Sequence, residues 1–321
     1  MRSIVATTLA ALLLLPGGLA VASHGAGPSP GAVGSPAAAP ATVRLLPLPE
    51  HQGGAPHPSK VRRRFRWLIP RARRDRPDGA RRPLVHIVYV TTTNRPSPPL
   101  DRYGVLEVSL RAQNRWMAAQ MARKWRLDTF RYRPDPRRAR RVRRVDVTFV
   151  RSGRRSSRLD TVAEVAALLR ARGFARSDRR YLAYVASDAG DVCGEAEYPL
   201  QDGDTGRYAA IFLYSAAGCG TRAFARRPGA PSWSEAVTLH EFVHNDGVAP
   251  LTSPHTCADS PGHICTAPLD LTDLDPEMPD LMFPYVTGPL DEKVLDRGRD
   301  DYLDHGLPYR DLRDSPFLRR T

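Results

Sequence analysis

The sequence predicts an α/β fold followed by a loop-rich C-terminal part. Between about residues 84 and 247, short runs of β-branched and aromatic residues alternate with segments whose apolar residues recur at helical spacing. Beyond about residue 248 the chain becomes rich in Pro, Asp and Thr, and we expect one short helix near residues 291–304. With 26% charged and 41% hydrophobic residues, the chain should form a globular core and is not a polytopic membrane protein.

Four segments have the composition of β-strands. β-branched and aromatic residues dominate them, and apolar and polar residues alternate clearly in the second. The segments are residues 85–90, 145–150, 181–185 and 208–214.

Two helices are expected between these strands. Thr161 and Glu164 form the capping-box pattern that opens the second helix, and Gly173 is placed to end it. The first helix is longer and carries its apolar residues on one face. These residues are Leu106, Leu110, Met117 and Met121.

Residues 1–22 have the pattern of a secretory signal peptide. Arg2 precedes an apolar run from Ile4 to Leu15, and Ala20 to Ala22 fits the small-residue rule for cleavage. The apolar run is shorter than the roughly 20 residues that span a bilayer. We therefore expect a secreted, extracellular protein, with an uncleaved anchor as the alternative.

Residues 23–83 are expected to be a disordered linker that is rich first in Pro, Gly and Ala and then in Arg. The basic part, 60–82, could contact an anionic envelope surface, although a solvated tail is the simpler interpretation. The net charge of +14 comes almost entirely from arginine, as in proteins of GC-rich genomes, so nucleic acid is not an expected partner. The folded domain then covers residues 84–321.

Four cysteines form an even set, which in an exported protein predicts disulfides. Four cysteines allow three pairings, and we favour the two that are local in sequence, Cys193 with Cys219 and Cys257 with Cys265. A cysteine zinc site would need CxxC-type spacing, which is absent.

Residues 232–247 predict a half-buried helix that carries a metal site. Ser232 and Glu235 form another capping box at its start, and a glycine follows its end. His240 and His244 are four residues apart, so both imidazoles lie on one helix face and can bind a single metal ion. Glu241 can hold a water molecule at that ion without becoming a ligand.

This HExxH stretch resembles the zincin zinc metalloproteases, and within them the metzincin-like group of secreted bacterial type. The resemblance covers roughly residues 84–290 and implies a mixed twisted sheet with flanking helices, an active-site helix and a bound Zn²⁺. The family motif continues with a glycine, matched by Gly247, and then with a third histidine, where this chain has Pro250.

The third zinc ligand must therefore come from elsewhere in the chain, because a catalytic zinc has three protein ligands and one open position. We favour His263, since Gly262 gives the backbone freedom and a Cys257–Cys265 bridge would fix the loop. The alternatives are His255, Asp246, an aspartate of residues 270–280, or no third protein ligand at all.

Residues 280–285 resemble the methionine-containing turn that lies beneath the zinc in metzincins, with Met282 as its methionine. Tyr285 could donate a hydrogen bond to a developing oxyanion, and ordinary core packing is the alternative for both side chains. The acidic residues 270–280 lack EF-hand spacing, so a solvated loop is favoured over a calcium site.

The expected function is that of a zinc-dependent metallopeptidase, a monomer that hydrolyses a peptide or protein substrate. Glu241 would act as the general base and then return the proton to the leaving amine. A GxSxG pattern occurs only at residues 27–31, in the Pro/Gly-rich linker and without the strand-to-helix context of a serine nucleophile. The alternative is a noncatalytic zinc-binding module that recognises a component of the cell envelope.

Overall fold

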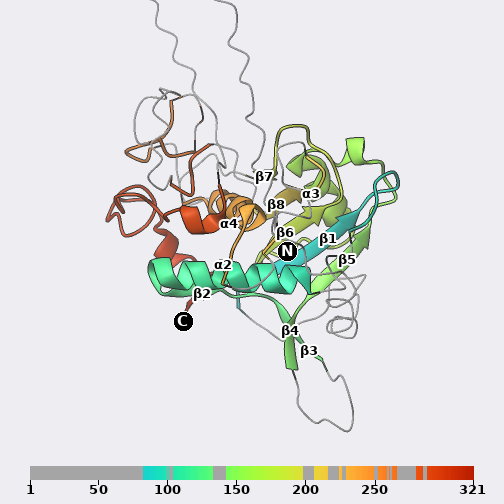
Figure 1. Ribbon diagram of the computed structural model, residues 1–321, viewed down its shortest axis with the longest axis horizontal. Helices are drawn as coiled ribbons and strands as arrows, with labels where there is room; N and C mark the ends of the chain where they lie inside the picture. The colour runs from blue at the N-terminus through green and yellow to red at the C-terminus, as the bar shows by residue number, and fades with distance from the viewer. Residues whose placement is uncertain are drawn as a thin grey trace, which may run out of the picture. The chain divides into compact units, whose positions relative to one another are not determined.

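A five-stranded mixed β-sheet lies at the centre of the computed structural model (Figure 1). The strand order is β5-β1-β6-β8-β7, and only the edge strand β7 runs antiparallel to its neighbour. The strands are β1 (Leu84–Thr91), β5 (Val147–Arg151), β6 (Arg179–Val185), β7 (Gly194–Ala196) and β8 (Tyr208–Phe212).

The structure describes the following residues: 82–98, 100, 104–132, 142–197, 206–215, 224–225, 229–248, 252–258, 260, 262–265, 280–284 and 288–321. The signal peptide predicted at residues 1–22, and the linker predicted at 23–83 except for its last two residues, lie outside them. Within the described part of the chain, none of the helices has the length and apolar character needed to cross a membrane.

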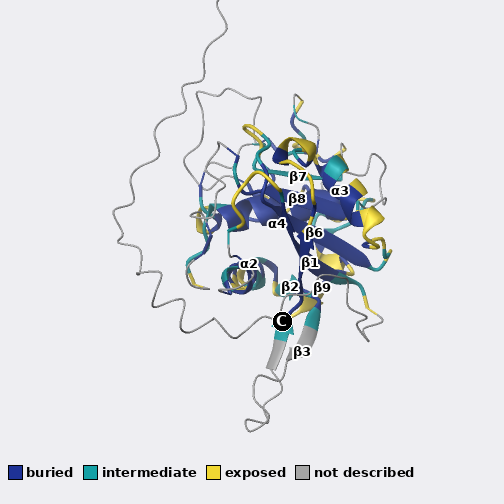
Figure 2. Cartoon of the chain, turned by 90° about the vertical axis from the view of Figure 1, so that its right-hand side faces the viewer, coloured by how far each residue is buried: buried dark blue, intermediate teal, exposed yellow. Residues whose placement is uncertain are grey.

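Helices cover both faces of the sheet. Side chains alternate between the two faces along each strand, and apolar residues occur on both faces, so each face is buried. On one face, Ile87 and Tyr89 share a buried cluster with residues of α2 (Val105–Met121) and α4 (Trp233–Asp246). On the other face, Val88 and Val90 pack with α3 (Val162–Ala171). Figure 2 shows the buried strands between these helices. The predicted α/β class is confirmed, with a mixed sheet and flanking helices.

Both helices expected between the strands form, and α3 begins and ends close to its predicted position. All four apolar residues of the predicted face of α2 are buried. In α3, the Thr161 side chain accepts a hydrogen bond from the Glu164 amide, whereas the Glu164 carboxylate accepts one from the Asp160 amide. Gly173 follows the helix with φ of 86°, a left-handed conformation that favours glycine.

The predicted strand 145–150 is divided into two strands that pair with different partners. β4 (Val142–Val145) pairs with β3 (Thr129–Tyr132) in a separate hairpin, whereas β5 pairs with β1. The change of partner occurs at Asp146, whose amide donates to the Asp128 carbonyl. A further small sheet joins β2 (Arg123–Trp125) to the C-terminal β9 (Leu318–Arg320).

The C-terminal part is rich in loops, as predicted, but the helix expected near residues 291–304 is absent from these described residues. A 3₁₀ turn, η3 (Leu290–Glu292), forms instead; η1 (Ser156–Arg158) and η4 (Leu312–Asp314) are similar turns elsewhere. The Asp296 carboxylate accepts hydrogen bonds from the amides of residues 301–303. Such side-chain bonds to the backbone compete with helix formation, and the aspartate itself is left-handed, with φ of 56°.

Candidate metal centre

Helix α4 is the element that carries the HExxH residues, and it forms where the sequence predicts. The capping box of Ser232 and Glu235 is present at its start, and Gly247 ends it with φ of 69°. We expected a half-buried helix, but Ser234 to Asp246 are all buried. The sheet and α2 pack against α4, and the ring of Phe242 lies 5.1 Å from that of Trp125. Burying a side chain such as Phe242 contributes about 1.5–3 kcal/mol, so α4 is a firmly held support.

Three histidines converge at α4. The Nε2 atoms of His240 and His244 are 3.0 Å apart, and those of His244 and His263 are 3.2 Å apart. One ligand atom from each of the three lies within 4.8 Å of the others. Two ligands of a tetrahedral zinc, with bonds of about 2.0–2.1 Å, are about 3.3 Å apart. The three imidazoles therefore have the spacing of a shared ion.

Backbone carbonyls fix the orientation of two of these rings. His240 Nδ1 lies 2.7 Å from the Leu281 carbonyl oxygen, and His263 Nδ1 lies 3.2 Å from that of Ser260 and 2.9 Å from the Ser260 hydroxyl. A carbonyl can only accept, so Nδ1 carries the proton in each ring. Nε2 is left with its lone pair for a metal, the usual arrangement around a metal-binding histidine.

Burial keeps the α4 histidines neutral. It lowers the pKa of His240 to about 3, with a smaller contribution from the charge of His263. It also lowers the pKa of His244 well below its ordinary value, helped by both neighbouring imidazoles. Neutral imidazole is the form that binds a metal, so protons do not compete with a cation at neutral pH.

The Glu241 carboxylate lies against the edge strand β7. A Cβ atom added to Gly194 would come within 2.6 Å of Glu241 Cγ and 2.8 Å of Glu241 Oε1. Glycine is thus the residue that leaves room for the carboxylate. Burial, and secondarily the charge of Glu195, raises the pKa of Glu241 to about 8.

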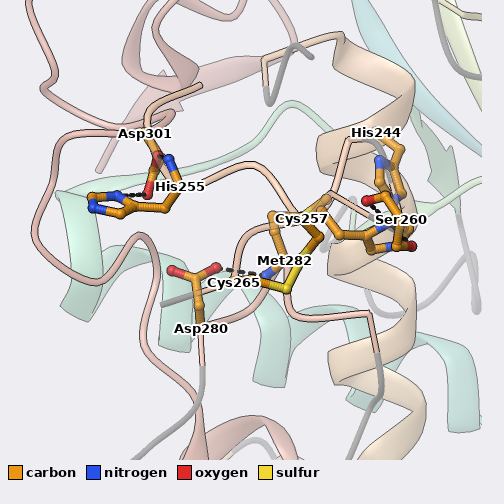
Figure 3. The surroundings of a disulfide bond; sticks show 9 residues. His244, His255, Cys257, Ser260, Cys265, Asp280, Met282 and Asp301 are labelled. Carbon is orange, nitrogen blue, oxygen red and sulfur yellow. Dashed lines mark hydrogen bonds and ion pairs between the residues drawn. A yellow bond between two sulfur atoms is a disulfide. The ribbon is translucent and has the colours of Figure 1, made fainter. Parts of the chain in front are cut away.

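The alternative ligand His255 is directed elsewhere. Its Nδ1 lies 3.0 Å from Asp301 Oδ2 and 3.8 Å from Asp300 Oδ1, and 44% of its side chain is exposed. The hydrogen bond with Asp301 is the main cause of a raised pKa at His255. Figure 3 places His255 and His244 on opposite sides of a disulfide.

Asp246, another alternative ligand, faces arginines. Its Oδ1 lies 3.7 Å from Arg180 and 4.0 Å from Arg310. Among the described candidates for the third ligand, only His263 lies beside the α4 pair. Asp280 instead accepts hydrogen bonds from Met282 N, Arg297 N and the Tyr302 hydroxyl, whereas residues 270–279 lie outside the described residues.

The Cys257–Cys265 disulfide forms as predicted and closes the loop that carries His263 (Figure 3). The loop is also held by backbone hydrogen bonds from Cys257 N to His263 O, at 2.9 Å, and from Cys265 N to His255 O, at 2.7 Å. Cys193 is disulfide-bonded too. Its predicted partner, Cys219, lies outside the described residues.

Met282 belongs to the turn that supports His240. Its side chain is fully buried in the same cluster as α4, and its carbonyl accepts a hydrogen bond from Ile264 N at 2.9 Å. The preceding residue, Leu281, supplies the carbonyl that orients His240. Tyr285, the predicted oxyanion stabiliser, lies outside the described residues.

Sequence reasoning missed several groups around this centre. The Leu281 carbonyl had no sequence signal, because every residue has a carbonyl. Gly194 and Glu195 lie about 45 residues from the motif, and nothing in their sequence indicates β7 or its position beside Glu241. Ser260, three residues before His263, is the one group whose spacing could have indicated its role.

Comparisons with known proteins identify no relative: no family model, curated protein or solved structure matches this chain.

Proposed function

We propose that the chain is a zinc-dependent metallopeptidase of zincin type. The observation that carries this proposal is the convergence of His240, His244 and His263 on one point, with Glu241 beside the first of them. A donor set of three imidazoles suits zinc and leaves one coordination position for water or substrate. When bound there, zinc would acidify water and polarise the scissile carbonyl.

Glu241 is the proton carrier in this proposal. The carboxylate follows His240 on a buried helix and rests against β7, so its position is fixed by packing. The pKa of this carboxyl would fall from about 8 beside a cation held by the histidines, because the positive charge favours its ionised form. The carboxylate could then accept the proton of the attacking water and donate it to the departing amine, so that one residue serves as base and then as acid.

An extended peptide is the substrate that the edge strand favours. β7 pairs with β8 in antiparallel fashion. At one end of β7 the Cys193 carbonyl accepts a hydrogen bond from Phe212 N, and at the other end Glu197 N donates to the Tyr208 carbonyl. Because hydrogen-bonded and non-bonded pairs alternate, the backbone groups of Gly194 and Ala196 point away from β8. A substrate chain could add to β7 through these groups, which would place a scissile amide beside Glu241.

We also infer that the protein is exported. The Cys257–Cys265 bridge requires an oxidising compartment to persist, in agreement with the signal peptide predicted at residues 1–22.

The test compares Glu241→Gln with His240→Ala in the full chain. The matched control is His305→Ala, because the His305 ring hydrogen-bonds to its near neighbours in sequence, Leu307 N and the Arg310 carbonyl. We expect Glu241→Gln to retain zinc but lose cleavage of an unstructured protein such as casein, and His240→Ala to lose both. The control should behave as wild type. Undiminished peptidase activity of Glu241→Gln would exclude the mechanism, and a zinc-bound wild type without any cleavage would favour the noncatalytic recognition module.

A further inference from the structure

A short segment after η3, residues 295–302, contacts both loops that surround the histidine cluster. We call it the clamp. We propose that the clamp is a positioning element that sets the orientation of the histidines around the metal. The inference rests on the metal site of the proposed function and concerns residues that do not touch the metal themselves.

The clamp is folded by its own buried polar groups. The Asp296 carboxylate accepts hydrogen bonds from the amides of residues 301–303, and the Asp296 amide donates to the Tyr302 hydroxyl at 2.8 Å. Asp296, Asp301 and Tyr302 are each at most 3% exposed. Buried polar groups that are satisfied in this way hold a single conformation, because breaking any bond leaves a buried group unpaired.

Tyr302 connects the clamp to His240. Its hydroxyl donates to Asp280 Oδ1 at 2.9 Å, and the same oxygen accepts from Met282 N at 2.7 Å. Asp280 Oδ2 accepts from Arg297 N, also at 2.7 Å. The carboxylate thus ties the turn of Asp280–Met282 to the clamp. The Leu281 carbonyl, which accepts from His240 Nδ1, lies in the middle of that turn.

Asp301 connects the clamp to the other loop. Its Oδ1 accepts from His255 N at 2.9 Å, and its Oδ2 lies 3.0 Å from His255 Nδ1 (Figure 3). The His255 carbonyl in turn accepts from Cys265 N, and Cys257 N donates to the His263 carbonyl. The disulfide joins the two cysteines, so the bonds of Asp301 hold the base of the loop that presents His263.

Adjacent clamp residues therefore hold two different parts of the metal centre. α4 is rigid enough to place its own histidines, but the Leu281 carbonyl and His263 belong to loops without regular structure. Metal sites need their ligands placed to within about 0.5 Å, and groups that orient a ligand typically change metal affinity 10–100-fold when altered. The clamp supplies that restraint here. The same interactions explain why His255 lies beside Asp300 and Asp301, since its Nδ1 pairs with both carboxylates.

The experiment measures zinc affinity of the full chain by chelator competition, together with the visible spectrum of bound Co²⁺. Tyr302→Phe removes only the hydroxyl that holds Asp280. We expect about tenfold weaker zinc binding and an altered cobalt spectrum. Tyr89→Phe is the matched control, because Tyr89 is also fully buried and donates to a backbone carbonyl, that of Pro98. It should lose some stability but keep wild-type affinity and spectrum.

Asp301→Asn provides a second variant of nearly unchanged volume, and we expect it too to weaken zinc binding about tenfold. The proposal is overturned if Tyr302→Phe binds zinc within twofold of the affinity of Tyr89→Phe and has the same cobalt spectrum. If Tyr302→Phe does not fold, the same comparison is made with Asp301→Asn. A match leaves the metal site itself standing. A wild-type chain that binds neither ion would overturn the clamp and the proposed function together.

Discussion

Gly194→Ala should reduce catalysis while leaving zinc in place. The added Cβ would lie 2.6 Å from Glu241 Cγ, 2.8 Å from Glu241 Oε1 and 2.8 Å from Val237 Cγ1. No metal ligand is among these neighbours. The variant therefore tests the position of the carboxylate separately from the integrity of the metal centre.

The size of the effect follows from the distances. Ordinary contacts of a Cβ begin at 3.4 Å, so Glu241 Cγ must move by about 0.8 Å, the difference between 3.4 and 2.6 Å. A misplacement of about 1 Å in a catalytic group can lower turnover about 100-fold. Crowding in the packed interior should also lower the free energy of unfolding by about 1–3 kcal/mol.

The assay follows casein cleavage by the zinc-loaded full chain, with zinc content and thermal unfolding measured on the same samples. Gly153→Ala is the control, because Gly153 has φ of 72° and no heavy atom within 4 Å of the added Cβ. Its left-handed backbone should lower stability by about 1–2 kcal/mol without affecting turnover. A Gly194→Ala protein with wild-type turnover would show that the Glu241 position does not limit the reaction, and one that has lost zinc would show that β7 supports the metal ligands.

The remaining predictions concern the third ligand, the disulfide and acid stability. His263→Ala should abolish tight zinc binding in a chelator competition, whereas His255→Ala, which removes a side-chain contact with Asp301, should weaken it about tenfold; the reverse order would assign the ligands the other way. Replacing Cys257 and Cys265 by alanine should lower the free energy of unfolding by about 2.5 kcal/mol in a urea titration and also weaken zinc binding, and unchanged zinc affinity would mean that the bridge does not hold the loop. Burial raises the pKa of Asp280 to about 6, so the folded protein retains a proton that the unfolded chain releases. The contribution of Asp280 to stability therefore falls as pH rises from about 4 to about 6. In urea unfolding, wild type should lose about 3 kcal/mol of stability relative to Asp280→Asn over that window. A constant difference between the two proteins would contradict the raised pKa.

The local signals of the sequence predicted α4 well. Its capping box, its terminal glycine and the spacing of His240 and His244 are properties of neighbouring residues, and the helix obeys them. The Cys257–Cys265 bridge was predicted for a similar reason, because two cysteines only eight positions apart close a short loop at a small cost in chain entropy. The convergence of His263 on the α4 pair agrees with the expectation, although its metal binding stays a prediction.

Contacts between distant segments were not predictable in the same way. β7 has three residues and no alternation, so its place beside Glu241 depends on pairing with β8. The helix expected near residues 291–304 failed because the Asp296 carboxylate bonds to backbone amides, an interaction that propensity alone does not reveal. The clamp contacts likewise join residues 22 and 46 positions apart in sequence.

Zinc K-edge X-ray absorption of the purified wild-type chain tests the central claim most directly. We predict one zinc per chain with three imidazole nitrogens at about 2.0–2.1 Å and one further light ligand, and the loss of one imidazole in His263→Ala. A chain that takes up no zinc, or a spectrum with fewer than three imidazoles, would contradict the account.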